Sequence, residues 1–80
     1  MRYRQIKDED GYVVRYEAIG HKAFIRVEYG SLSHNRPSGF TPIANGKVFR
    51  SCQRLKDAKS FLESVITFKN IMNGAVINME

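Results

Sequence analysis

The chain has 80 residues, of which 42% are hydrophobic and 26% are charged, and its formal net charge is +5. Eighty residues give room for one compact core, so we expect one small domain over residues 1–80 and do not expect a multi-component enzyme pocket. The composition is typical of a globular protein, and no apolar run approaches the roughly 18 residues that a membrane span needs. Since residues 1–5 also lack the apolar core of a signal peptide, we expect a cytoplasmic protein without membrane contact.

The first thirty residues predict strands. Residues 3–7 and 12–18 flank an acidic turn at residues 8–11, whose Asp-Gly pair can supply the positive φ of a tight hairpin. Residues 22–29 then alternate between mainly apolar side chains at the odd positions and mainly charged side chains at the even positions. This alternation is typical of a strand with one buried face. A short link at residues 19–21 favours antiparallel pairing of this third strand with the second.

The alternation assigns side chains to the two faces of the predicted sheet. The inner face is expected to include Val14, Ile25 and Val27. The outer face then carries arginines and glutamates that can pair across strands, together with one aromatic side chain, Phe24.

A second hairpin is predicted after an extended loop at residues 30–39, which is dense in turn-forming residues. Asn45-Gly46 is the strongest short hairpin signal in the chain, and it lies between two candidate strands, residues 40–44 and 47–51. Pro42 restricts the first of these to an edge position or an irregular strand, because proline donates no backbone hydrogen bond.

From Leu55 onward the apolar period changes to three and four residues, which predicts a helix with one buried stripe. The stripe consists of Leu55, Ala58, Phe61, Leu62, Val65 and Phe68. We expect Phe61, Leu62 and Val65 to face the inner side of the sheet.

The end of this helix is predicted at Asn70 or at Asn73-Gly74, with Ala75–Met79 forming a short strand or a free end. The fold class that follows is α+β, an antiparallel sheet of three to five strands packed on one face by a single C-terminal helix.

Three local fragments resemble the YegP-like family of small domains built from β-strands and a helix. They are Lys7-Asp8-Glu9-Asp10-Gly11, Asn45-Gly46-Lys47-Val48, and Glu63-Ser64-Val65 ahead of Lys69-Asn70. The resemblance is interrupted over residues 19–40 and concerns the layout of the elements. It implies the same α+β fold and no defined activity.

Positive charge is concentrated in the middle of the chain. Residues 31–60 have a net charge of +5, six basic residues less the single acid Asp57. The basic residues are Arg36, Lys47, Arg50, Arg54, Lys56 and Lys59. Several fall where the helix is predicted to begin, the end at which the helix dipole and free N–H groups attract anions. The patch therefore predicts binding of nucleic-acid phosphates or of an acidic protein surface.

Three alternatives stay open beside this prediction. The basic residues can be an ordinary solvated surface that keeps a small domain soluble. The outer sheet face offers a secondary candidate surface, Arg15, Phe24 and Arg26, on which an aromatic ring could stack a base. The alternative function is that of a phage- or plasmid-type small protein that inhibits or modulates a host protein complex, as an antidefence or anti-CRISPR-like inhibitor. A homodimer is compatible with each of these.

Motifs for catalysis are missing from the sequence. His21 and His34 have no neighbouring ligands at metal spacing, and Cys52, the only cysteine, is more typical of a small buried hydrophobe than of a nucleophile. The acids at residues 8–10 fit a solvated hairpin tip, and the glycines do not form a phosphate-binding loop. We therefore expect a binding protein that is not an enzyme and has no cofactor or metal.

Overall fold

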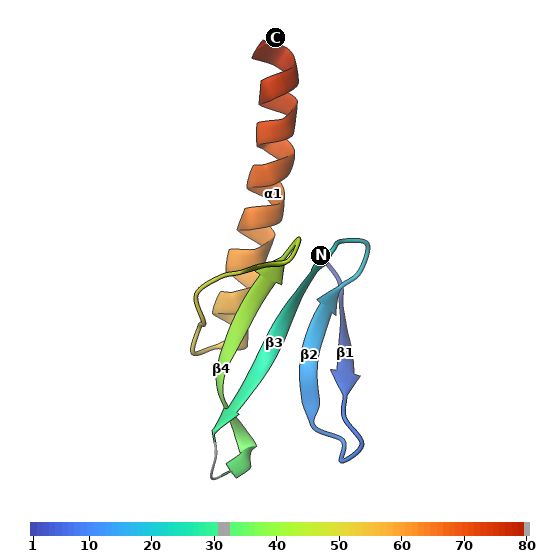
Figure 1. Ribbon diagram of the computed structural model, residues 1–80, viewed down its shortest axis with the longest axis vertical. Helices are drawn as coiled ribbons and strands as arrows, with labels where there is room; N and C mark the ends of the chain where they lie inside the picture. Colours follow the sequence, from blue (N-terminus) through green and yellow to red (C-terminus); the bar gives the residue numbers. More distant parts are fainter. Residues whose placement is uncertain (31–32, 80) are drawn as a thin grey trace.

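A computed structural model describes the backbone of residues 1–30 and 33–79 and the side chains of residues 1–30 and 36–67. Within these residues the chain forms a five-stranded antiparallel sheet in the order β1-β2-β3-β4-β5, followed by one helix (Figure 1). The predicted α+β class is confirmed. The elements are β1 (Tyr3–Lys7), β2 (Val13–Ala18), β3 (Ala23–Gly30), β4 (Ser33–Ala44), β5 (Lys47–Val48) and α1 (Leu55–Met79).

The turn between β1 and β2 is held by its own first residue. The Asp8 carboxylate accepts hydrogen bonds from the backbone N–H groups of Asp10, at 2.9 Å, and of Tyr12, at 3.0 Å. Gly11 supplies the left-handed backbone with φ 88°. The acidic turn is therefore a hairpin tip in which the Asp8 side chain accepts hydrogen bonds from two backbone N–H groups of the turn.

The turn of the β4–β5 hairpin has the geometry that its sequence predicts, although the second strand, predicted over residues 47–51, ends at Val48. Asn45 and Gly46 have φ values of 52° and 80°, so both central residues of the turn are left-handed, as a two-residue primed turn requires. The strands leaving the turn pair Ala44 with Lys47 and Ile43 with Val48.

The prediction of a loop over residues 30–39 is wrong for most of that range, because β4 already begins at Ser33. β3 continues to Gly30 and offers partners to this segment, although the register shifts on both sides of Tyr29. Turn-forming residues are tolerated in such an irregular ladder, since bulges relax the geometry of the strand. At Gly39 an added Cβ would lie 2.7 Å from the Ser51 hydroxyl oxygen, so glycine allows the next chain segment to approach.

Pro42 lies in an inner strand of the sheet, which corrects the expectation of an edge position and leaves the irregular strand as the correct alternative. Its carbonyl accepts the Phe49 N–H at 2.9 Å, on the side of β4 that faces β5. The N–H that proline lacks falls on this same side, where the ladder ends at Val48. The pairing of β4 with β3 is therefore preserved.

The core lies where α1 crosses the inner face of the sheet. Ile25, Ala58 and Leu62 are completely buried in one cluster, and Val65 packs against that cluster. Phe61 differs from the prediction: it is 40% exposed and meets the edge of the Phe49 ring at 5.3 Å between centroids. Val14 and Val27 lie outside the cluster that contains Leu62.

The helix continues beyond both predicted ends and reaches Met79, so the short strand or free end expected at Ala75–Met79 is helical instead. Its second half extends past the sheet (Figure 1). Asparagine and glycine weaken a helix interior by no more than about 1 kcal/mol each, and no proline follows Leu55 to break it.

The core assignment predicts that Leu62→Ala lowers the free energy of unfolding by roughly 2–5 kcal/mol, because a fully buried side chain is lost and a cavity remains. Urea denaturation of the variant and the parent measures the difference. Thr67→Ala, at an exposed position of the same helix, is the control and should change stability little. Equal unfolding midpoints for Leu62→Ala and the parent would contradict this core.

Candidate nucleic-acid interface

The segment that joins β5 to α1 runs back along the free edge of β4. The Phe49 N–H donates to the Pro42 carbonyl, and Phe40 and Cys52 exchange two backbone hydrogen bonds of 2.7 and 2.8 Å. This ladder places three basic residues in succession along one edge of the sheet. We call them the edge strip: Lys47, Arg50 and Arg54.

All three side chains of the edge strip are exposed. The Lys47 ammonium lies 5.3 Å from the centre of the Phe49 ring. The ring attracts the ammonium group but does not neutralise its charge. Arg54 lies immediately before the helix, and its carbonyl accepts the N–H of Ala58 at 3.1 Å. The strip therefore ends at the positive end of the helix dipole.

Lys59 does not join the edge strip. It is five residues beyond Arg54 and therefore about 140° further around the helix. Its ammonium lies 5.0 Å from the Tyr3 ring centre and 5.6 Å from that of Tyr16. The Tyr3 hydroxyl donates to the Glu63 carboxylate at 3.2 Å, so this part of the helix holds β1 and β2. Lys59 thus serves an internal contact.

Two further residues of the predicted patch are exposed but lie apart from the edge strip. Lys56 is two residues beyond Arg54, which places it about 160° away around the helix. Arg36 belongs to the first part of β4, at the opposite end of that strand from the turn that leads to Lys47. Of the six residues predicted from the sequence, Lys47, Arg50 and Arg54 therefore follow one another along the segment beside β4.

Ion pairs among the described side chains are confined to the outer face of the sheet. They join Arg4 to Glu17 at 3.2 Å, Arg15 to Glu17 at 3.0 Å, and Arg26 to Glu28 at 2.6 Å. None of them includes a residue of the edge strip. Its positive charges are therefore not offset by any acid that the structure describes within ion-pair distance.

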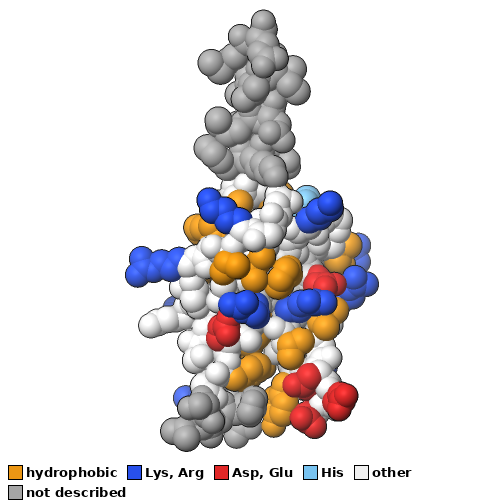
Figure 2. Space-filling view, viewed as in Figure 1, with side chains coloured by type: hydrophobic (Ala, Val, Ile, Leu, Met, Phe, Trp, Pro, Cys, Tyr) orange, Lys and Arg blue, Asp and Glu red, His pale blue; other side chains and the backbone are white. Residues whose placement is uncertain are grey.

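The secondary surface predicted from the sequence is brought together on this outer face. Arg15 and Arg26 are direct partners across β2 and β3, and the Arg15 guanidinium lies 5.5 Å from the centre of the Phe24 ring. Figure 2 shows basic side chains interspersed with hydrophobic ones over the strands, with acids gathered at the β1–β2 hairpin tip.

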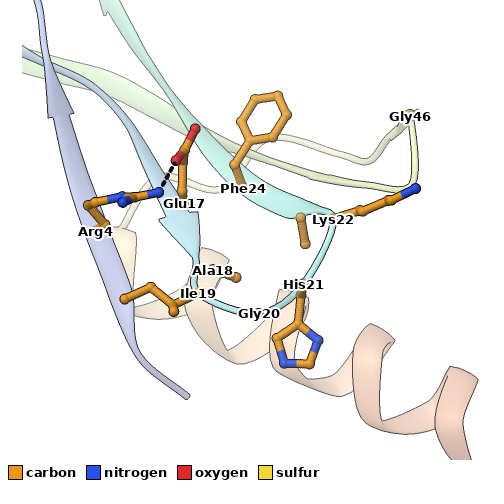
Figure 3. A pocket seen from close by; sticks show the side chains of 10 residues that line it. Arg4, Glu17, Ala18, Ile19, Gly20, His21, Lys22, Phe24 and Gly46 are labelled. Atoms are coloured by element: carbon orange, nitrogen blue, oxygen red, sulfur yellow. Dashed lines mark hydrogen bonds and ion pairs between the residues drawn. The ribbon is translucent and has the colours of Figure 1, made fainter.

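A hollow of about 440 Å³ lies beside this surface, where the turn between β2 and β3 meets the β4–β5 turn. Its lining includes Arg4, Glu17, His21, Lys22, Phe24 and Gly46. In Figure 3 the paired Arg4 and Glu17 lie on the same side as Phe24, whereas His21 turns to the opposite side. Sequence reasoning missed this hollow; the available signal was Gly20, whose φ of 86° allows the sharp turn that forms one wall.

The described residues offer little for catalysis or for metal binding. Cys52 is half-buried against the core, and its sulfur has a weak contact of 3.9 Å with the Arg50 carbonyl. The side chain of His34 lies outside the described residues. Within the described part of the chain no three His, Cys, Asp or Glu side chains are grouped so that they could hold a metal ion.

Comparisons with family models, with curated proteins and with solved structures found no match to this chain. Among the described residues, no helix combines the length and the apolar character that crossing a membrane requires.

The contact between β1 and the helix predicts a pH effect at Tyr3. Partial burial, the Glu63 charge and the hydrogen bond to Glu63 raise the pKa of Tyr3 from 10.0 to about 12. A phenol whose pKa is higher in the folded state stabilises the fold fully below pH 10, and this contribution is lost as the pH rises from 10 towards 12.

Tyrosinate absorbance, recorded for the parent and for Tyr3→Phe, measures this ionisation as the difference between two titrations. We expect the missing titration step to lie near pH 12. A missing step near the ordinary value would show that the Tyr3–Glu63 contact does not form in solution.

Proposed function

We propose that this protein is a small non-enzymatic nucleic-acid-binding domain that contacts backbone phosphates through the edge strip. The observation that carries the proposal is a row of three exposed cations beside the helix start, none paired with a described acid. Solvated lysines and arginines are common on protein surfaces, but here they follow one another along one β-edge, whereas the arginines of the neighbouring sheet face are paired.

The dimensions of the edge strip fit a run of phosphates. Lys47 lies opposite Ala44, and Cys52, two residues before Arg54, lies opposite Phe40. Four strand positions correspond to roughly 13 Å. Phosphates on one strand of DNA follow one another with an axial rise of about 3.4 Å, so a segment of this length is long enough to meet several of them. Contacts of this kind orient a protein on nucleic acid and do not read the bases.

The principal test replaces Arg50 and Arg54 together by glutamine. Binding of the variant to duplex DNA should weaken to a similar extent for unrelated sequences, because only phosphate contacts are lost. The slope of log K against log salt should become shallower by about 0.9 for each contact removed. Fluorescence anisotropy over a series of salt concentrations measures both effects.

A variant with Arg2→Gln and Lys7→Gln is the matched control, since it removes the same charge from exposed positions outside the edge strip. It should keep the parent's salt slope. Absence of parent binding to DNA and RNA at low salt would overturn the proposal. A stoichiometric pull-down of an acidic protein that survives nuclease would then favour the alternative, an inhibitor of a host protein complex.

A further inference from the structure

The apolar pattern of α1 continues beyond the part of the helix that the sheet covers. Ala58 and Leu62 are fully buried in the core, whereas the second half of α1 extends past the sheet (Figure 1). Apolar residues nevertheless recur along the helix as far as its end, at alternating steps of four and three residues. We call these positions the seam: Phe61, Val65, Phe68, Met72, Ala75 and Met79.

The spacing of the seam is that of a coiled coil. Alternating steps of four and three give a period of about 3.5 residues, which keeps one side of a helix turned toward a second helix. The seam is not a continuation of the sheet contact, because Phe61 is about 100° around the helix from Leu62. Phe61 is accordingly 40% exposed, although it is a large apolar side chain.

The second half of the helix needs a partner for its stability. Residues 68–79 include Asn70, Asn73 and Gly74, which are weak helix formers. A helix of about twelve residues with this composition is marginal in water on its own, and most helices in proteins owe their stability to the packing of an apolar face. Figure 1 shows no other described segment beside this half of α1. Its packing therefore comes from another molecule.

The composition of the seam fits a second copy of the same chain. The seam contains no charged residue, and Lys69 is the only charged residue among positions 68–79, so two seams can meet without burying charge. Phe68 can bury roughly 150–250 Å² in each copy. With the methionines and the exposed part of Phe61 added, the contact between two copies approaches the roughly 1,000 Å² that a specific interface needs.

We propose that two copies of this chain form a symmetric dimer in which their α1 helices pack antiparallel along the seam. The direction follows from Arg54, which lies seven residues before Phe61 and therefore on the same side of the helix, at its start. A parallel pair would set the two copies of Arg54 against each other, whereas an antiparallel pair places them at opposite ends. The inference does not depend on the proposed function.

Sedimentation velocity of the parent, from micromolar to millimolar concentration, tests the dimer. The mass should rise from the 9.2 kDa of one chain towards twice that value. Met72→Glu should raise the dissociation constant of the dimer roughly a hundredfold, because the interface would bury two unpaired carboxylates. Thr67→Glu is the matched control, since it adds the same charge to an exposed position of α1 outside the seam, and it should dimerise as the parent does.

Circular dichroism melts establish that both variants are folded, and Ala75→Glu repeats the test nearer the end of the helix. A parent that stays monomeric at millimolar concentration would overturn the dimer. Folded Met72→Glu and Ala75→Glu variants that dimerise as tightly as the parent would overturn the seam as its interface. Binding of a monomeric parent to phosphatidylcholine vesicles would assign the seam to a lipid surface instead.

A distance between the two copies tests the antiparallel arrangement. Spin labels are attached at Ser60→Cys in Cys52→Ser protein, an exposed position just before the seam. In the antiparallel dimer the two labelled positions are about 30 Å apart along the helix axis, because each lies ten residues from the centre of the seam. Parallel helices would place them about 10 Å apart, the spacing of two packed helices. A pulsed EPR distance near this shorter value would overturn the antiparallel arrangement.

Discussion

The structure depends on the packing of one helix against one face of the sheet. Ala58 and Leu62 of α1 are fully buried with Ile25 of β3, and this contact decides which side of every strand lies inside. Because side chains alternate along a strand, the same contact places Arg15, Phe24 and their neighbours on the open face. A single helix cannot cover both faces of a sheet, so the outer face remains exposed, and so do the side chains of the edge strip on the segment that pairs with β4.

The distribution of charge follows from this layout. Arginines on the open face are held by glutamates on the same face, which preserves a sheet surface that would otherwise carry only like charges. Lys59 faces the tyrosines of β1 and β2, where its charge contacts aromatic rings. In the edge strip Lys47 contacts the Phe49 ring in a similar way, but all three side chains are exposed, whereas Lys59 is half-buried. No residue of the edge strip forms an ion pair with an acid that the structure describes, so its charge is available to an external anion.

The sequence predicted those features that depend on local chemistry. Alternation over residues 22–29, the Asn45-Gly46 turn and the helix from Leu55 each reflect a backbone period or a required φ, and each is present. Of the predicted apolar stripe, Phe61 is exposed, and the side chain of Phe68 lies outside the described residues. The features it missed depend on distant segments. The long β4 forms because β3 offers it a partner, and Lys59 leaves the predicted patch because Tyr3 and Tyr16 lie beneath the helix. Neither the pairing of β4 with β3 nor the contact of Lys59 with the two tyrosines can be read from the residues that are adjacent in sequence.

The central claim is that the edge strip meets nucleic-acid phosphates, and an NMR titration of ¹⁵N-labelled protein with a short duplex DNA at low salt tests it most directly. The account predicts chemical-shift changes concentrated at the amides of residues 47–54 and at the Arg50 and Arg54 Nε–H groups. Amides of the β1–β2 acidic turn should stay in place. Shift changes that spare residues 47–54, or a spectrum that the duplex leaves unaltered, would contradict it.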